Sequence, residues 1–321
     1  MGTYDVTALG ELLIDFTENG ISSQGNPVME ANPGGAPCNV LSMLNRLGHK
    51  TNFIGKIGKD MFGSQLETAL KEVGIGTDGL VFDEKIHTTL AFVHTAPDGD
   101  REFSFYRNPG ADMMLSEDEV DLEQIKSSRI FHFGSLSMTD EICRKTTRKA
   151  VSAAKEAEVL ISFDPNLREP LWKSMEEARG QIAYGLSQCQ ILKISDNEIQ
   201  WLTGREDYDE GIAVIKEKFD IPLILLSMGK EGSRAYIGSR RVEVPAFIQK
   251  DTIETTGAGD TFDACVLHYI LEHGWREYSE AELKEMLTFA NAAASIVTTR
   301  KGALRVMPSQ KEIENVLSTA K

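Results

Sequence analysis

The chain has 321 residues, of which 41% are hydrophobic and 26% are charged, a balance typical of a folded globular protein. Its 49 acidic residues outnumber 34 lysines and arginines, so the formal net charge is −15, and no basic cluster that could follow a phosphate backbone is present. We therefore expect no nucleic-acid partner. An anionic ligand would have to be held locally, by backbone amides, a helix N-terminus or a metal ion.

Apolar runs of strand length alternate along the chain with amphipathic segments of helix length. The predicted strands span residues 4–9, 51–57, 130–133, 159–163, 191–194 and 221–227. The predicted helices span residues 39–47, 61–73, 139–157, 174–188, 208–219, 259–273 and 281–298, and a last helix follows the capping-box pattern of Ser309 and Glu312. This alternation predicts an α/β fold, with a mostly parallel central sheet and helices on both faces.

Two segments interrupt this rhythm, at about 12–33 and 86–108, with strand-like alternation of apolar and polar residues. A turn is predicted at 97–100 within the second segment. Both segments fit a small antiparallel sheet that stands off the main sheet. The chain contains no internal repeat, low-complexity tract or linker, so we predict a single domain over residues 1–321.

The cysteines lie far apart and form no CxxC pair, which excludes a zinc signature or a dense disulfide framework and indicates reduced thiols. They are Cys38, Cys143, Cys189 and Cys265. The first residues have neither the basic segment nor the apolar stretch of a signal peptide, and Val6 stands where a myristoylation motif needs Ser or Thr. We expect a cytoplasmic protein that does not enter a membrane.

The most informative stretch is Thr-Thr-Gly-Ala-Gly-Asp-Thr-Phe at 255–262, where small residues directly precede a predicted helix. Amides at Gly257, Ala258 and Gly259 would point outward at the positive end of that helix, which is a favourable site for an anion. Asp260 has two interpretations. It is either a first-turn acid of the helix, or a base that takes a proton from a hydroxyl attacking a bound phosphate.

A second glycine cluster lies at 32–40. Gly34 and Gly35 would let the backbone approach a ligand closely, and Asn39 can both donate and accept hydrogen bonds towards a polyol. The alternative is a plain turn and helix start, with Pro37 near the first helical position.

Polar residues also follow several predicted strands, at the edge where open parallel sheets place their ligands. They are Asp15, Asp164, Arg168, Ser227, Gly229 and Gly232. Each could also belong to an ordinary loop. Ser195 and Glu198 have capping-box spacing, which a structural role alone would explain.

The chain contains no GxxxxGK[ST] phosphate loop, GxGxxG fingerprint, HExxH or GxSxG motif. Instead, Gly-Gly-Ala-Pro-Cys-Asn at 34–39 and Thr-Gly-Ala-Gly-Asp-Thr-Phe at 256–262 resemble the two signatures of the PfkB/ribokinase-type carbohydrate kinases. The finer pattern at 10–16, 105–112, 163–168 and 192–195 is most similar to fructokinases. The resemblance implies a ribokinase-like fold in which the two strand-like segments form a small lid.

The resemblance also implies roles by position. Asp260 would be the general base, and the turn of Gly257, Ala258 and Gly259 the anion hole for the transferring phosphoryl group. The sugar would be bound by Asp15, Gly34, Gly35, Asn39, Arg107 and Arg168. ATP would lie along Ser195, Ser227, Gly229, Gly232 and Asn291, with Glu198 reaching Mg²⁺ through water.

Two positions at the expected site for a monovalent cation depart from the family pattern. Glu254 stands six residues before the base, where many relatives carry Asp in a site for a monovalent cation that the loop at 300–302 completes. The residue that completes this loop as Ser in ribokinases is Val306 here. We therefore expect potassium stimulation to be weak or absent.

These features predict ATP-dependent phosphorylation of fructose at its primary hydroxyl, which would give fructose 6-phosphate. The alternatives are another kinase of the family acting on a sugar acid or a pentose, such as 2-keto-3-deoxygluconate kinase or ribokinase, and a non-catalytic sugar-binding regulator. An apolar lid edge at Leu90 and Phe92 could pair with a second subunit, which predicts a homodimer through the lid.

Overall fold

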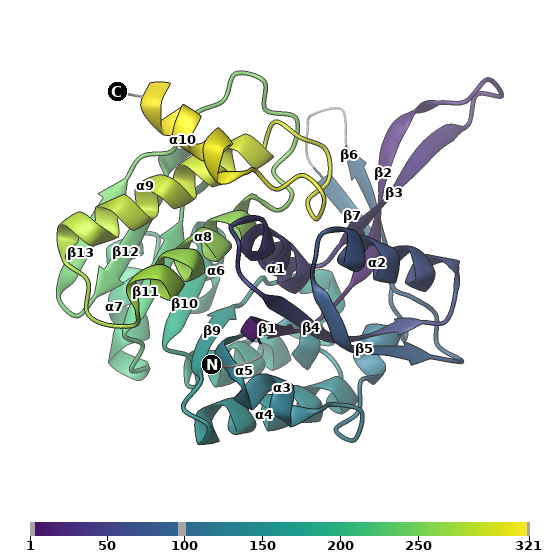
Figure 1. Cartoon of the computed structure of the whole chain (residues 1–321), viewed down its shortest axis with the longest axis horizontal. Coiled ribbons are helices and arrows are strands. Elements are labelled where there is room, and N and C mark those ends of the chain that lie inside the picture. Colours follow the sequence, from purple (N-terminus) through teal and green to yellow (C-terminus); the bar gives the residue numbers. More distant parts are fainter. Residues whose placement is uncertain (1–3, 96–100, 320–321) are drawn as a thin grey trace.

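A central sheet of nine strands organises the protein, whose computed structural model describes residues 4–95 and 101–319 (Figure 1). The strand order is β13-β12-β11-β10-β9-β8-β1-β4-β5, and all neighbours from β11 to β5 are parallel. The strands are β1 Tyr4–Leu9, β4 Thr51–Gly58, β5 Gly76–Asp83, β8 Ser128–Gly134, β9 Leu160–Asp164, β10 Ile191–Ser195, β11 Leu223–Ser227, β12 Ser233–Ile237 and β13 Arg240–Val244. This arrangement confirms the predicted fold class.

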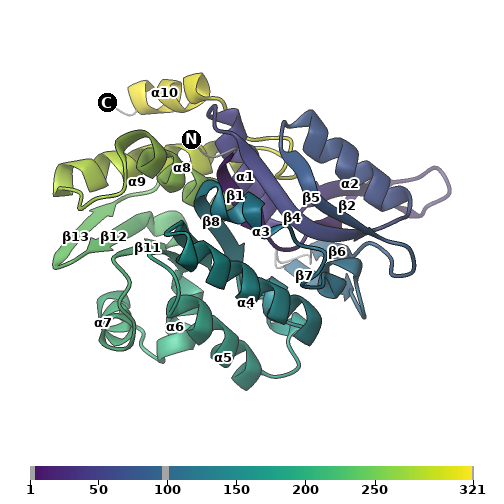
Figure 2. The same cartoon turned by 60° about the horizontal axis from the view of Figure 1, so that its bottom comes forward.

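Helices cover both faces of this sheet (Figure 2). One face is covered by α1 Ala36–Arg46, α2 Met61–Glu72, α8 Ala258–His273, α9 Glu280–Val297 and α10 Gln310–Thr319. The other is covered by α3 Leu122–Lys126, α4 Glu141–Glu156, α5 Met175–Leu186, α6 Asp196–Thr203 and α7 Tyr208–Lys218. Side chains along β1 point alternately to the two faces of the sheet, so Val6 belongs to the first core and Leu9 to the second.

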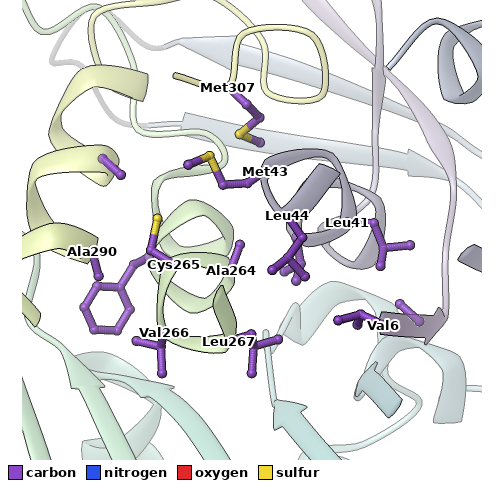
Figure 3. Close-up of a cluster of buried hydrophobic side chains, with 14 of the residues drawn as sticks. Val6, Leu41, Met43, Leu44, Ala264, Cys265, Val266, Leu267, Ala290 and Met307 are labelled. Atoms are coloured by element: carbon purple, nitrogen blue, oxygen red, sulfur yellow. The ribbon is translucent and has the colours of Figure 1, made fainter. Parts of the chain in front are cut away.

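The contact between α1 and α8 fixes the position of both helices at the centre of the first core (Figure 3). Leu41 and Leu44 of α1 are fully buried, and so are Ala264 and Leu267 of α8. Truncating one such leucine to alanine typically costs about 2–5 kcal/mol, because the cavity left behind does not close. The two helices therefore begin at fixed positions beside each other.

A smaller sheet stands off the main one and forms the lid, with strand order β3-β2-β6-β7 (Figure 1). Its strands are β2 Leu13–Ile21, β3 Pro27–Gly34, β6 Leu90–Thr95 and β7 Arg101–Tyr106. Pairs β2–β3 and β6–β7 are antiparallel, but β2 and β6 run parallel, so the lid is mixed rather than wholly antiparallel. The turn predicted at 97–100 lies outside the described residues.

The predicted lid edge at Leu90 and Phe92 is wrong. Both residues belong to β6, which is paired on both sides, by β2 and by β7. The ring of Phe92 stacks on Phe16 at a centroid distance of 4.8 Å and contacts Tyr106 at 5.2 Å. The backbone of β6 is thus used within the lid and is not free to pair with a second subunit.

All four cysteines are buried and unpaired, as predicted. Within the described residues, no helix combines the length and the apolar character needed to cross a membrane.

Candidate active site

A cavity of about 1170 Å³ opens at the carboxyl ends of the parallel strands, between the lid and the start of α8. This is the edge at which doubly wound sheets bind ligands. Most of the predicted site residues line it: Asp15, Gly35, Asn39, Arg168, Ser195, Glu198, Ser227, Gly229, Gly232, Glu254, Gly257, Ala258, Gly259, Asp260 and Asn291. Gly34 and Arg107 are the two that do not.

The turn before α8 has the shape of an anion-binding site. Gly257 caps the helix in the left-handed region, with φ 76°, where a residue with a side chain would be strained. The amide of Ala258 already donates to the carbonyl of Thr255 over 3.2 Å, so the amides of Gly257 and Gly259 are the better candidates to contact an anion. The helix dipole favours negative charge at this point.

Asp260 faces the cavity from the first turn of α8. Its Oδ2 accepts a hydrogen bond of 2.7 Å from Nδ2 of Asn39 in α1. Burial in the surrounding protein raises the pKa of this carboxyl, while the Asn39 hydrogen bond, Lys193 and Arg168 oppose the rise. The Asp260 carboxylate is therefore hydrogen-bonded to a second helix, α1. An acid that served only the first turn of α8 would not need this contact.

One polar atom of the Asn39 side chain is left without a hydrogen bond within the described part of the chain. Its Oδ1 is buried and, among the described residues, has no hydrogen-bond partner. A buried acceptor without a partner costs free energy.

Asp15 lies on β2 at the lid side of the cavity. Burial raises its pKa to about 7; Arg168 opposes this rise, and Glu254 and Asp260 add to it. A side chain at Gly34 would overlap Oδ2 of Asp15, and one at Gly35 would overlap the backbone carbonyl of Glu11. The two glycines thus make room for the acid and for the chain turn, and Gly34 itself does not line the cavity.

Glu11 also belongs to the cavity, although it was not among the residues predicted from the sequence. It lines the cavity, and its Oε1 accepts a hydrogen bond of 3.0 Å from the amide of Ala36, at the start of α1. Burial raises the pKa of Glu11 to about 7. The signal in the sequence was an acid placed directly after a buried strand.

Lys193 and Asp164 form a buried ion pair beneath the start of α8; Asp164 was among the polar residues predicted at this edge of the sheet, and Lys193 was not. Their Nζ and Oδ2 atoms are 2.9 Å apart, and a carbon added at Gly259 would lie 3.1 Å from Nζ. Burial alone would lower the pKa of Lys193, but Asp164 and Glu198 raise it overall. An ammonium group therefore lies under the amide turn, where it favours an anionic ligand.

On the side of the cavity predicted to bind the nucleotide, several side chains already make hydrogen bonds within the protein. Ser195 and Glu198 make the capping box of α6, and the second Glu198 oxygen accepts from the amide of Leu167 over 2.7 Å. The Asn291 amide accepts from the Ser233 hydroxyl and donates to the carbonyl of Val244. These residues shape the wall of the cavity while keeping their internal hydrogen bonds.

Glu254 reaches the loop at 300–302. Its Oε1 accepts a hydrogen bond of 2.7 Å from the amide of Gly302, and both residues line the cavity. The amide of Ile253 donates to Thr298 at the end of α9. The Glu254 carboxylate thus binds the backbone of this loop directly.

Arg107, predicted to contact the sugar, is instead part of a buried ion pair outside the cavity wall. Its Nη2 is 2.6 Å from Oδ2 of Asp112, and the guanidinium also donates to the Thr139 hydroxyl and the Leu136 carbonyl. Each of its three nitrogens donates to a group within the protein, and Asp112 neutralises its buried charge.

The fold and this cavity define an α/β phosphotransferase-like site with a lid, and comparison with known proteins identifies its class. Residues 4–310 match the family model described as "pfkB family carbohydrate kinase". The chain therefore belongs to the PfkB family and is a carbohydrate kinase. It is 43% identical over 314 residues to "Probable fructokinase-4" of Arabidopsis thaliana, covering 97% of this chain and 96% of that protein.

Two solved structures have the same fold over nearly the whole chain. The fructokinase of Xylella fastidiosa with bound ATP has a TM-score of 0.89 and 29% identity, and the match covers 99% of both chains. A double-mutant fructokinase of Vibrio cholerae O395, in a form with bound fructose, ADP and potassium ion, has a TM-score of 0.87 and 27% identity, and the match again covers 99% of both chains.

Proposed function

We propose that the protein is an ATP-dependent fructokinase that transfers the γ-phosphoryl group to the primary hydroxyl of fructose and gives fructose 6-phosphate and ADP. The observation that carries this proposal is the position of Asp260, which faces the cavity beside the Gly257–Gly259 turn and is held by Asn39. A base and an anion-binding turn are thus adjacent at one end of one cavity.

The proposed chemistry needs few covalent steps. Asp260 accepts the hydroxyl proton as the sugar oxygen attacks the phosphorus atom and the bond to the ADP oxygen breaks. The amides of Gly257 and Gly259, the dipole of α8 and the Lys193 ammonium stabilise the charge on the transferring group. The lid excludes water, which would otherwise compete with the sugar for the phosphoryl group.

The two ends of the cavity have different chemistry, which suits two substrates. At the lid end, Asp15, Asn39 and Arg168 offer hydrogen-bonding groups suited to a polyol, beside Gly35. At the other end, Ser195, Ser227, Gly229, Gly232 and Asn291 line the wall proposed for ATP.

Mg²⁺ would accompany ATP and neutralise charge on its phosphates. Both Glu198 oxygens already accept hydrogen bonds from the protein, as Oε2 does from Ser195 and Oε1 from Leu167. This fits a role for Glu198 in which it contacts the water shell of the ion, and not the ion itself.

The similarity to plant and bacterial fructokinases favours fructose over the alternatives, which are a sugar acid such as 2-keto-3-deoxygluconate, or ribose. We further propose that residues 1–321 fold as one domain with the lid inserted at about 12–33 and 86–108. A cytoplasmic location remains a prediction from the sequence.

A sugar panel tests the proposal. ADP release is measured with fructose, glucose, ribose and 2-keto-3-deoxygluconate, with Asp260→Asn as the background control, and the product is analysed by phosphorus NMR. We expect the highest kcat/KM with fructose and a phosphate on O6. If kcat/KM were higher with ribose or the sugar acid, that compound and not fructose would be the substrate. If no sugar gave a phosphorylated product, the protein would be a non-catalytic regulator.

A further inference from the structure

Three side chains of metal-binding types converge outside the cavity, where the loop before β4 meets the second half of α8. They are His49, His268 and Glu272, whose ligand atoms all lie within 4.8 Å of one another. His268 and Glu272 are four residues apart on α8 and so share one helix face. None of the three lines the cavity, and His268 lies about 12 Å along the helix from Asp260, at 1.5 Å per residue.

The two imidazole rings already face each other. Nε2 of His49 is 2.7 Å from Nδ1 of His268 and 3.9 Å from Oε1 of Glu272. Tetrahedral zinc with Zn–N bonds of about 2.0–2.1 Å holds two nitrogens roughly 3.3 Å apart, so a small ring movement would admit an ion. The Glu272 side chain is 56% exposed, which leaves it free to adjust and leaves the ion a path from solvent.

Asp5 lies on the other side of the His49 ring from His268. Its Oδ2 accepts from the amide of Lys50 over 2.9 Å and lies 4.0 Å from Nδ1 of His49, while Oδ1 pairs with Arg129. At 4.0 Å this carboxylate makes no hydrogen bond to Nδ1, but a modest ring movement would bring it into the supporting position that carboxylates take behind metal-binding histidines.

We propose that His49, His268 and Glu272 form a binding site for a divalent transition-metal ion such as Zn²⁺, with water as the fourth ligand. Two imidazoles and one carboxylate are a ligand set suited to zinc, whereas Mg²⁺ prefers oxygen ligands and would go with the nucleotide. The ion would join the loop before β4 to α8, the helix that carries Asp260 at its other end.

The test uses the full chain without a histidine tag, stripped of metal and kept in excess Mg²⁺. Titration with Co²⁺ is followed by the visible d–d absorption of a tetrahedral complex, and Zn²⁺ is then added as a competitor. We expect one equivalent of Co²⁺ to bind and to be displaced by Zn²⁺. We also expect the thermal midpoint to rise with Zn²⁺, because an ion that binds only the folded state stabilises it.

Two variants locate the site. His268→Gln and Glu272→Gln should each weaken Co²⁺ binding on the order of 10-fold or more, a loss at least as large as that seen when a supporting residue of a metal site is removed. The matched control is His87→Gln, since the His87 side chain is 90% exposed and lies outside the cluster. It should bind Co²⁺ like the wild type.

The competing explanation is a pair of histidines that is only hydrogen-bonded. No visible band in the wild type, or equal affinity in the wild type and in Glu272→Gln, would overturn the proposal. Because Glu272 is exposed, this variant gives an answer even if a histidine variant fails to fold. The cysteines do not confuse the spectrum, since all four are buried.

Discussion

The side-chain amide of Asn39 donates a hydrogen bond of 2.7 Å to Asp260, although the two residues are 221 positions apart in the chain. Each lies in the first turn of its helix, and the packing of α1 on α8 brings the two helix starts together. Oδ1 of Asn39 has no partner among the described residues, so Asn39 holds Asp260 through its Nδ2 donor.

Replacing Asp260 by Asn removes the proposed base and keeps the size of the side chain. We expect kcat to fall by roughly 10²–10⁴-fold, the usual effect of losing a general base, while ATP binding is retained. Steady-state kinetics and calorimetric titration with ATP measure the two quantities. Asp118→Asn, at an exposed acid remote from the cavity, serves as the control, and near-normal turnover in Asp260→Asn would remove this residue from the mechanism.

Asp15 should make sugar binding depend on pH near neutrality. Its pKa is raised to about 7, mainly by burial, and only the deprotonated form accepts two hydroxyl hydrogen bonds. As the pH falls through this value the carboxylate is lost, so KM for the sugar should rise. Above it, KM should level off.

The matched variant is Asp15→Asn, which cannot titrate. Its KM should be higher and should no longer change around pH 7, while the wild-type KM changes in the direction given above. The readout is KM, and kcat is compared separately because Asp260 titrates as well. An equally steep pH dependence of KM in the variant would assign the titration to another group, of which Glu11 is the nearest candidate by pKa.

The main sheet could be predicted from sequence because its strands are buried on both faces. Every residue of β4 is buried, and Phe53, Ile54 and Ile57 give it the apolar character from which it was predicted. The strands that were missed lie at the two edges of the sheet. β5 ends the sheet beside β4, and Gly79 is its one buried residue. β12 and β13 form an antiparallel hairpin at the sheet edge, where Arg234 and Arg241 interrupt any apolar pattern. The parallel pairing of β2 with β6 depends on contacts distant in sequence, which local pattern does not encode.

The site was predictable where a motif fixes the backbone, as at Gly257, whose positive φ begins α8. It was less predictable where burial decides a role. Lys193 stands in an otherwise apolar strand, and only the fold reveals that its ammonium lies beneath Gly259. The motif around Arg107 likewise does not reveal that Asp112, five residues on, neutralises it inside the protein.

The ion pair of Arg107 and Asp112 should matter for stability more than for sugar binding. Removing one partner of a buried pair leaves the other charge uncompensated, so Arg107→Met should lower the free energy of unfolding by about 3–5 kcal/mol. Urea unfolding measures this loss. The double variant with Asp112→Leu should recover part of it, because no buried charge then remains.

A matched comparison with Arg168 separates the two roles. Arg168 is exposed and lines the cavity, so Arg168→Met should raise KM for the sugar with little effect on unfolding. Arg107→Met should do the reverse at a temperature where it remains folded. A large rise in KM for Arg107→Met without a loss of stability would restore Arg107 as a sugar-binding residue.

Potassium should have little effect on the rate, and Glu254 supplies the physical reason. Its Oε1 is taken by the amide of Gly302, and the Val306 carbonyl accepts a hydrogen bond of 2.7 Å from Arg300. A monovalent cation at this loop would have to compete with both hydrogen bonds for its oxygen ligands.

The test replaces Na⁺ by K⁺ at constant ionic strength and follows kcat, with choline as the control for ionic strength. The prediction is discriminating because a fructokinase of the same fold has been solved with bound potassium ion. A many-fold rise in kcat with K⁺ would mean that the loop rearranges when ATP binds and that Glu254 releases Gly302 to make room for the ion.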